Sequence, residues 1–143
     1  MVDTIRHRET VLAIIVRAEF RCDGIRFFTP NEFSQQLAYM NRPAGYAIAP
    51  HVHNPIKREV QYTKEVLFIR SGRLRVDFYS EEQEYLKSAL LHAGDVILLA
   101  YGGHGFEILE DAEIIEVKQG PYAGDADKTR FSAIARSNVR IDC

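Results

Sequence analysis

The chain has 143 residues, of which 46% are hydrophobic and 27% charged, and its formal net charge is −2. This length and composition are typical of an ordinary globular protein, so we expect a single domain over residues 1–143. The small net charge, with no stripe of Lys and Arg, argues against nucleic acid as a partner. The longest apolar stretch is far shorter than the roughly 20 residues of a membrane span, so we also expect no membrane partner.

The first ten residues, MVDTIRHRET, lack the apolar region and the cleavage site of a signal peptide. Cys22 and Cys143 are the only cysteines, and they form neither a C-x-x-C pair nor a disulfide framework. We therefore expect reduced thiols and a cytoplasmic location. His7, in a charged stretch, and His92, before a Gly-Asp turn, are interpreted as solvated surface residues.

Short runs rich in β-branched and aromatic residues follow one another along the chain. The first covers residues 10–20 and ends near an Asp-Gly turn, and the second covers residues 25–30. Residues 33–40 fit a helical turn or a strand, and residues 41–45 form a turn. Further strands are expected over residues 46–53, 65–72, 73–80, 84–91, 95–103, 104–111 and 112–120. Because no long helical period interrupts this series, the pattern predicts an all-β sandwich or barrel.

The expected strand over residues 73–80 alternates clearly. Its odd-numbered positions, from Arg73 to Tyr79, carry polar or hydroxyl-bearing side chains, whereas its even-numbered positions are Leu74, Val76 and Phe78. Since successive side chains of a strand point to opposite faces, we expect one wet face and one buried face. Residues 122–143 mix small and charged side chains and are interpreted as a C-terminal extension on the outside, partly helical or disordered.

Two histidines separated by one residue, His51 and His53, lie at the end of the expected strand over residues 46–53. Positions i and i+2 of a strand project to the same face, and imidazole is a common ligand of transition metals. Two exposed polar residues at a strand end are the simpler interpretation of such a pair taken alone. Two carboxylates that could complete a metal site follow at Glu59 and Glu65.

The positions of four glycines relative to these histidines and glutamates strengthen the metal interpretation. Gly45 precedes the histidine pair, Gly72 follows Glu65, and Gly94 and Gly102 precede His104. In these motifs the sequence resembles the cupin superfamily over a motif core of residues 45–118. The resemblance implies a double-stranded β-helix (a jelly-roll or cupin barrel) that holds one divalent metal ion, which would be Fe, Mn, Zn or Ni. The metal ligands that it implies are His51, His53, Glu65 and His104.

The chain departs from the cupin pattern at several points. More residues separate His53 from the glutamate than in the family motif, Ala100 stands where a proline is usual, and the final asparagine is absent. Glu59 is therefore a rival for the carboxylate ligand. We favour Glu65 because a glycine stands at the seventh place after it and because it leads directly into a strand. Three of the five histidines fall at motif positions.

The extra residues between His53 and Glu65 are the first candidates for binding a substrate. Lys57 and Arg58 could hold an anion, and Tyr62 could donate a proton or cap the barrel, although a solvated charged loop is the alternative. Phe106, in phase with His104, would provide an apolar wall. Lys118 would be a second anion contact or an acid–base group if it points inward, and otherwise part of a surface pair.

These features predict a metal-dependent enzyme that acts on a small polar or anionic metabolite, with a sugar-derived compound as one option. Isomerase, lyase and oxygenase chemistry all remain open, because a fold alone does not choose a reaction. The alternatives are a non-catalytic module that binds a metabolite or a metal, and a metal-free enzyme of the sugar-nucleotide epimerase type. We further expect a homodimer, in which the apolar strand over residues 10–20 pairs with its counterpart.

Overall fold

The structure is a computed structural model that describes residues 1–142. The chain forms two compact units, one of residues 21–61 and the other of residues 1–20 together with residues from 62 onward. Strands make up 46% of the residues, and within residues 1–142 the helical segments are two short 3₁₀ turns in the C-terminal extension. The prediction of an all-β protein is confirmed. No helix of the described chain is long and apolar enough to cross a membrane.

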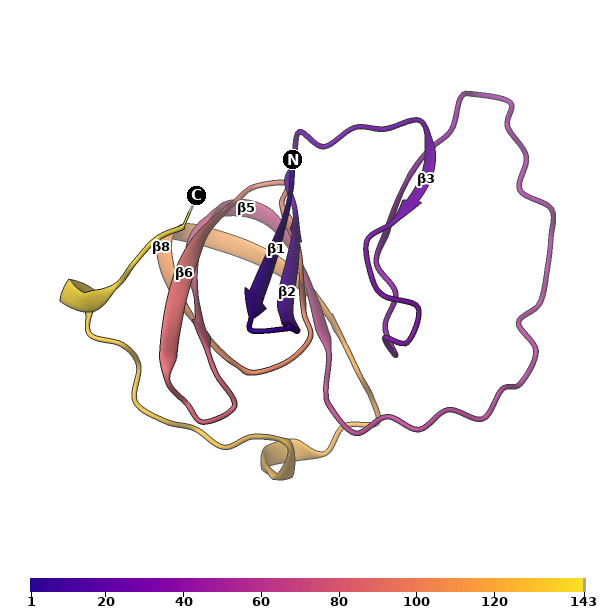
Figure 1. The fold of residues 1–143 in the computed structure, drawn as a ribbon. Helices are drawn as coiled ribbons and strands as arrows, with labels where there is room; N and C mark the ends of the chain where they lie inside the picture. Colours follow the sequence, from indigo (N-terminus) through magenta and orange to yellow (C-terminus); the bar gives the residue numbers. More distant parts are fainter. Residues whose placement is uncertain (143) are drawn as a thin grey trace. The chain divides into compact units, whose positions relative to one another are not determined.

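The larger unit is a curled antiparallel sheet of six strands (Figure 1). The strand order is β1-β2-β7-β5-β6, and β8 pairs with the other edge of β5. The strands are β1 (Val2–His7), β2 (Thr10–Val16), β5 (Glu65–Tyr79), β6 (Tyr85–His92), β7 (Val96–Leu99) and β8 (Gly103–Lys118). The curl is compatible with a barrel. The double-stranded β-helix itself stays a prediction.

Strand β2 has both of its edges occupied, by β1 on one side and by β7 on the other. Sequence reasoning missed β1, whose charged residues hide its strand pattern. Residues 10–20 therefore do not offer the free edge that we expected to pair with a second copy, and that route to a dimer is wrong. The expectation of a homodimer as such stays a prediction.

Strands β5 and β8 form one long bent pair that organises the sheet. Each merges two of the strands expected from the sequence. In β5 the chain bends at Gly72, where the two expected strands were divided. Gly72 has φ of +81°, and a Cβ atom there would lie 2.1 Å from the carbonyl oxygen of Asp111. The register between the two strands shifts around Ser71 and Arg73. These irregularities bend the strand without ending it.

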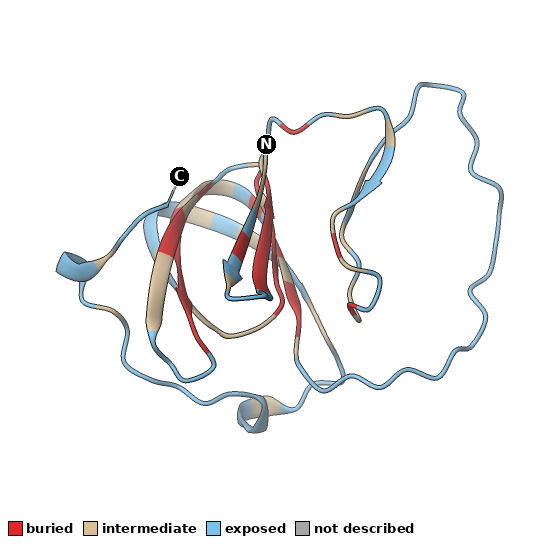
Figure 2. Ribbon diagram, viewed as in Figure 1, coloured by how far each residue is buried: buried red, intermediate tan, exposed pale blue. Residues whose placement is uncertain are grey.

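The hydrophobic core lies on the inner face of this curled sheet (Figure 2). Leu74, Val76 and Phe78 of β5 are buried there, as the alternation predicts. They pack with apolar residues of the neighbouring strands, among them Leu12, Ile15, Leu91, Ile97 and Leu99.

The outer face of β5 is also buried at Arg75, Asp77 and Tyr79, so the prediction of a wet face over residues 73–80 is wrong there. Arg75 is 8% exposed and Asp77 is 3% exposed. Two hydrogen bonds join them, from Arg75 Nε to Asp77 Oδ1 over 2.7 Å and from Arg75 Nη2 to Asp77 Oδ2 over 2.9 Å. Ser88 donates a further hydrogen bond to Asp77, and Glu107 pairs with Arg75. The hydrogen bonds to Asp77 raise the pKa of Arg75 although its burial opposes this, so the guanidinium stays charged.

The C-terminal extension explains this burial, because it packs on the outside of the sheet as the sequence suggested. It contains the 3₁₀ turns η1 (Gly124–Asp127) and η2 (Arg136–Asn138). Further on it runs along the edge of β6, where the Ser88 amide donates to Arg140 and Ile141 forms a parallel bridge with Ser88. Between the turns, the ring of Phe131 packs on the ring of Tyr79 at 5.0 Å between centroids.

Replacing Tyr79 by phenylalanine is expected to loosen this extension locally. The Tyr79 hydroxyl accepts a hydrogen bond of 2.9 Å from the Ile134 amide, and its loss should cost about 1 kcal/mol. Hydrogen exchange at Ile134 should therefore accelerate about fivefold, with no change at Ile97 in the core. Unchanged exchange at Ile134 would mean that the extension is held elsewhere.

The smaller unit contains one hairpin, formed by β3 (Gly24–Phe27) and β4 (Ala38–Asn41). The strand predicted over residues 25–30 is thus confirmed in part, and the ambiguous residues 33–40 end in a strand. Residues 42–61 form neither helix nor strand and are exposed. The strand predicted over residues 46–53 is therefore wrong. Pro43, Pro50 and Pro55 lack the amide hydrogen that a strand ladder requires, which weakens pairing there.

Candidate functional site

Glu65 and His104 lie side by side in the larger unit, with His104 Nε2 3.3 Å from Glu65 Oε2. They come from opposite ends of the β5–β8 pair, since Glu65 is the first residue of β5 and His104 lies opposite Phe78 near its other end. Both side chains follow the period of the core residues and so belong to the inner face. The bend at Gly72 curls the strand until its two ends face each other.

Lys118 and Phe106 of β8 extend this cluster. Lys118 lies opposite Glu65 in the register, and its Nζ is 3.8 Å from Glu65 Oε1. The structure therefore places Lys118 beside Glu65 rather than in a surface pair with Glu116. Phe106 is two residues from His104 on the same strand face, with 5.6 Å between the ring centroids. Their roles toward a substrate stay a prediction.

The carboxylate of Glu65 is held in its charged form. The hydrogen bond with His104 lowers the pKa of Glu65, burial of the carboxylate opposes this, and the positive charges of His104, Lys118 and Lys128 lower the pKa further. Glu65 is 7% exposed, so its charge is only weakly screened by water. A buried carboxylate surrounded by basic groups can orient an imidazole, bind a cation or balance a bound ligand.

Three residues that precede or follow these strands line the same end of the unit. Lys64 is buried, and its Nζ lies 4.6 Å from the centre of the Tyr101 ring. Tyr62 packs edge-on against Tyr101 at 5.5 Å between ring centroids. Sequence reasoning found Tyr62 but missed Lys64 and Tyr101, since no spacing or motif marks a cation that rests on an aromatic ring.

His51 and His53 belong to the smaller unit and are exposed. Their rings lie close together, with 5.2 Å between the centroids, and His51 Nδ1 is 2.9 Å from the carbonyl oxygen of Ala49. The other candidates in this segment, Lys57, Arg58 and Glu59, are exposed as well. The contact with His104 is what distinguishes Glu65 from the rival Glu59.

The four predicted metal ligands are therefore found as two pairs, one in each unit. Within residues 1–142 no three His, Cys, Asp or Glu side chains gather closely enough to hold a metal ion. In kind, the donors fit: one carboxylate and three imidazoles suit a divalent transition metal. Each pair supplies two adjacent donors, which is half of such a set. The metal site stays a prediction.

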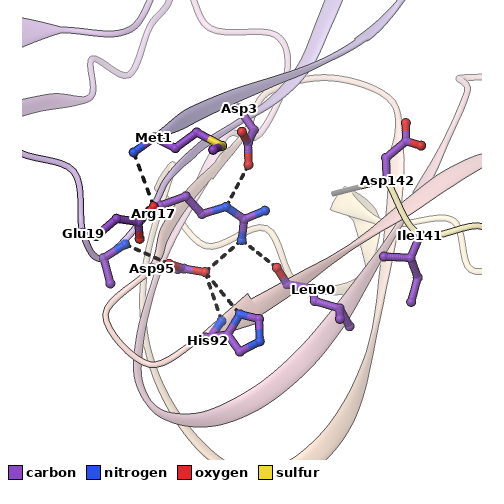
Figure 3. Close-up of a pocket in the computed structure, with 10 residues that line it drawn as sticks. Met1, Asp3, Arg17, Glu19, Leu90, His92, Asp95, Ile141 and Asp142 are labelled. Carbon is purple, nitrogen blue, oxygen red and sulfur yellow. Dashed lines mark hydrogen bonds and ion pairs between the residues drawn. The ribbon is translucent and has the colours of Figure 1, made fainter.

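A second cluster, near the N-terminus, lines a hollow of about 390 Å³ (Figure 3). Arg17 is central to it: Arg17 Nε donates to Asp3 Oδ2 over 2.7 Å, and Arg17 Nη1 donates to Asp95 Oδ2 over 2.9 Å. Burial opposes the charge of Arg17, but these carboxylates raise its pKa overall. His92 at the rim is exposed, as predicted. Because its charges pair with one another, this cluster ties β1, β2 and the β6–β7 turn together.

Searches with the chain find no matching family model, no matching curated protein and no matching solved structure. What is established is thus an all-β fold with a curled antiparallel sheet. The site that this sheet builds on its inner face contains Glu65, His104 and Lys118.

Proposed function

We propose that this protein is a cupin-type, mononuclear metal-binding enzyme for a small polar or anionic metabolite. The observation that carries the proposal is the contact between Glu65 and His104, two residues that lie 39 positions apart and were assigned as ligands from their motifs alone. The inner face of the sheet has many positions, and the two that meet there are a carboxylate and an imidazole. That pairing is what a metal site would require.

In this proposal His51 and His53 complete the ligand set. Their rings lie together, with 5.2 Å between the centroids, so this segment presents two adjacent imidazole donors. Residues 54–64 connect them to Glu65, and a chain of this length can span up to about 36 Å. When bound, the metal would supply a Lewis acid or a redox centre with open positions for substrate oxygens.

The remaining residues would bind and orient the substrate. Lys118 would balance negative charge beside Glu65, and Phe106 would exclude water from one side of the site. Lys57, Arg58 and Tyr62 are further candidates for contacts with an anionic group. Isomerase, lyase and oxygenase reactions are all compatible with these roles.

A second candidate function follows from the same contact. A carboxylate that holds an imidazole by a hydrogen bond also orients it for proton transfer without a metal. Lys118 would then stabilise the negative charge that develops on the substrate. This arrangement corresponds to a metal-free isomerase or epimerase and requires neither His51 nor His53.

Metal content separates the two candidates. We expect the purified protein, after incubation with Fe, Mn, Zn or Ni and removal of excess ions, to retain about one ion per chain by plasma mass spectrometry. His104→Ala and His51→Ala should each weaken metal affinity by at least tenfold, because each removes a ligand. His7→Ala and His92→Ala serve as matched controls and should bind as the unmodified protein does.

Three results would decide against the metal enzyme. These are no retained metal in the unmodified protein, full retention by His104→Ala, and equal losses in the control variants. Retention lost in His104→Ala but kept in His51→Ala would remove the histidine pair from the site. If the protein binds no metal and a proton-exchange activity depends on His104 and Glu65, the metal-free candidate is supported.

A further inference from the structure

A short part of the C-terminal extension, residues 127–131, is fixed at both ends beside the two site residues. At one end, Thr63, which lies two residues before Glu65, donates a 2.6 Å hydrogen bond from Oγ1 to Asp127 Oδ1. At the other end, the ring of Phe131 packs so closely on Gly103, next to His104, that a Cβ atom there would lie 2.9 Å from Phe131 Cζ. The segment thus runs from the residues next to Glu65 to the residues next to His104.

Lys128 occupies this segment directly after the anchored Asp127. Its side chain is exposed, and it forms no ion pair with the carboxylates of residues 1–142. The neighbouring charged residues have partners: Arg130 pairs with Asp125 over 3.2 Å, and Asp127 accepts the hydrogen bond from Thr63. Lys128 therefore keeps its donors available near the site.

Lys118 provides a second ammonium beside Glu65. Its Nζ is 3.8 Å from the carboxylate, a loose contact that leaves donors free. Two available lysines beside a single buried carboxylate form a suitable site for an anion.

We propose that Lys128 and Lys118 together bind an anionic group, a phosphate or a carboxylate, of the small molecule that enters at Glu65 and His104. This inference rests on the proposed function of that site and specifies its substrate class. The C-terminal extension then has a role in binding besides covering the sheet: the bond between Thr63 and Asp127 positions Lys128.

The test uses the full chain with its lysines labelled by reductive ¹³C-methylation, which retains their charge. Inorganic phosphate is titrated in one arm and succinate in the other, with NMR detection. The largest shifts should fall on Lys118 and Lys128, and the tighter-binding probe identifies the preferred group. Lys128→Met should weaken binding about fivefold, as the loss of one ion pair implies, whereas Lys128→Arg should retain it.

Two further variants make the result specific. Thr63→Val removes the tether of Asp127 and should also weaken binding, although Lys128 itself is unchanged. Lys87→Met removes a lysine of β6 that pairs with Asp142, and this variant should bind the anion as the unmodified protein does. Equal affinity of Lys128→Met and the unmodified protein in both arms, or an equal loss in Lys87→Met, would overturn the proposal.

Metal content measured on the same samples keeps this proposal separate from the proposed function. Lys128→Met should retain metal as the unmodified protein does, because Lys128 is not a ligand. Loss of anion binding with retained metal supports the anion site. Unaltered anion binding with retained metal overturns the anion site alone, whereas absence of metal in every sample counts against the metal enzyme alone.

Discussion

Replacing Asp77 by alanine is expected to lower the free energy of unfolding by about 3–5 kcal/mol, one of the two largest effects that we predict. The change removes two hydrogen bonds from the buried guanidinium of Arg75 and leaves Glu107 as its ion-pair partner. Ser88, which is fully buried, also loses one of its two side-chain hydrogen bonds and keeps the one with Tyr85. Urea unfolding followed by circular dichroism measures the effect.

The exposed pair between Lys87 and Asp142 provides the control for Asp77. Asp142→Ala breaks an ion pair between a carboxylate and a cation at the surface and should leave the free energy of unfolding nearly unchanged. The double change Arg75→Met with Asp77→Leu should recover most of the stability, because it removes both buried charges. A cost for Asp77→Ala as small as that of Asp142→Ala would show that water reaches Arg75 readily.

Replacing Gly72 by alanine is expected to cost about 3 kcal/mol or more, for two reasons that add. A side chain at a φ of +81° costs about 1–2 kcal/mol, and the new Cβ would lie 2.1 Å from a backbone oxygen of β8. Since the obstacle is backbone, strands β5 and β8 would have to separate. Urea unfolding measures the loss, and weakened anion or metal binding would report the altered bend.

Gly124 is the matched control, because it also has a positive φ, of +62°, but has space for a Cβ atom. Gly124→Ala should cost only about 1–2 kcal/mol, the contribution of backbone conformation alone. Equal costs at the two positions would mean that the contact with β8 does not constrain Gly72. If Gly72→Ala costs at least about 1 kcal/mol more than Gly124→Ala, the excess is the contribution of the close contact between Gly72 and the backbone of β8.

Alternation along the chain predicted the inner face of β5 correctly but not its outer face. Leu74, Val76 and Phe78 are buried because apolar side chains at every second position can leave water together on one face of a strand. Arg75 and Asp77 were expected in water, since nothing in their local sequence indicates a cover. They are buried because a distant part of the chain packs over them and because they satisfy each other's charge.

For the candidate site, local motifs predicted the position of a side chain correctly only where the residue lies in a strand. Glu65 and His104 were chosen from the glycines around them, and both lie in strands and in contact. His51 and His53 were placed on a strand that the structure does not contain, because a strand also needs a partner edge and proline-rich residues 42–61 pair poorly. Lys128 was missed because its position depends on one hydrogen bond between residues far apart in sequence.

By itself the sequence determined the all-β class, the buried face of residues 73–80, the exposure of His92, and which residue types are available to bind a metal or an anion. These properties follow from composition, periodicity and turn chemistry, which act over a few residues. His7, expected in water, is half-buried in β1. Only the tertiary structure decided that Glu65 meets His104, that the outer face of β5 is covered, and that residues 127–131 lie beside the site. Each of these depends on long-range packing, which brings together residues whose local patterns carry no information about one another.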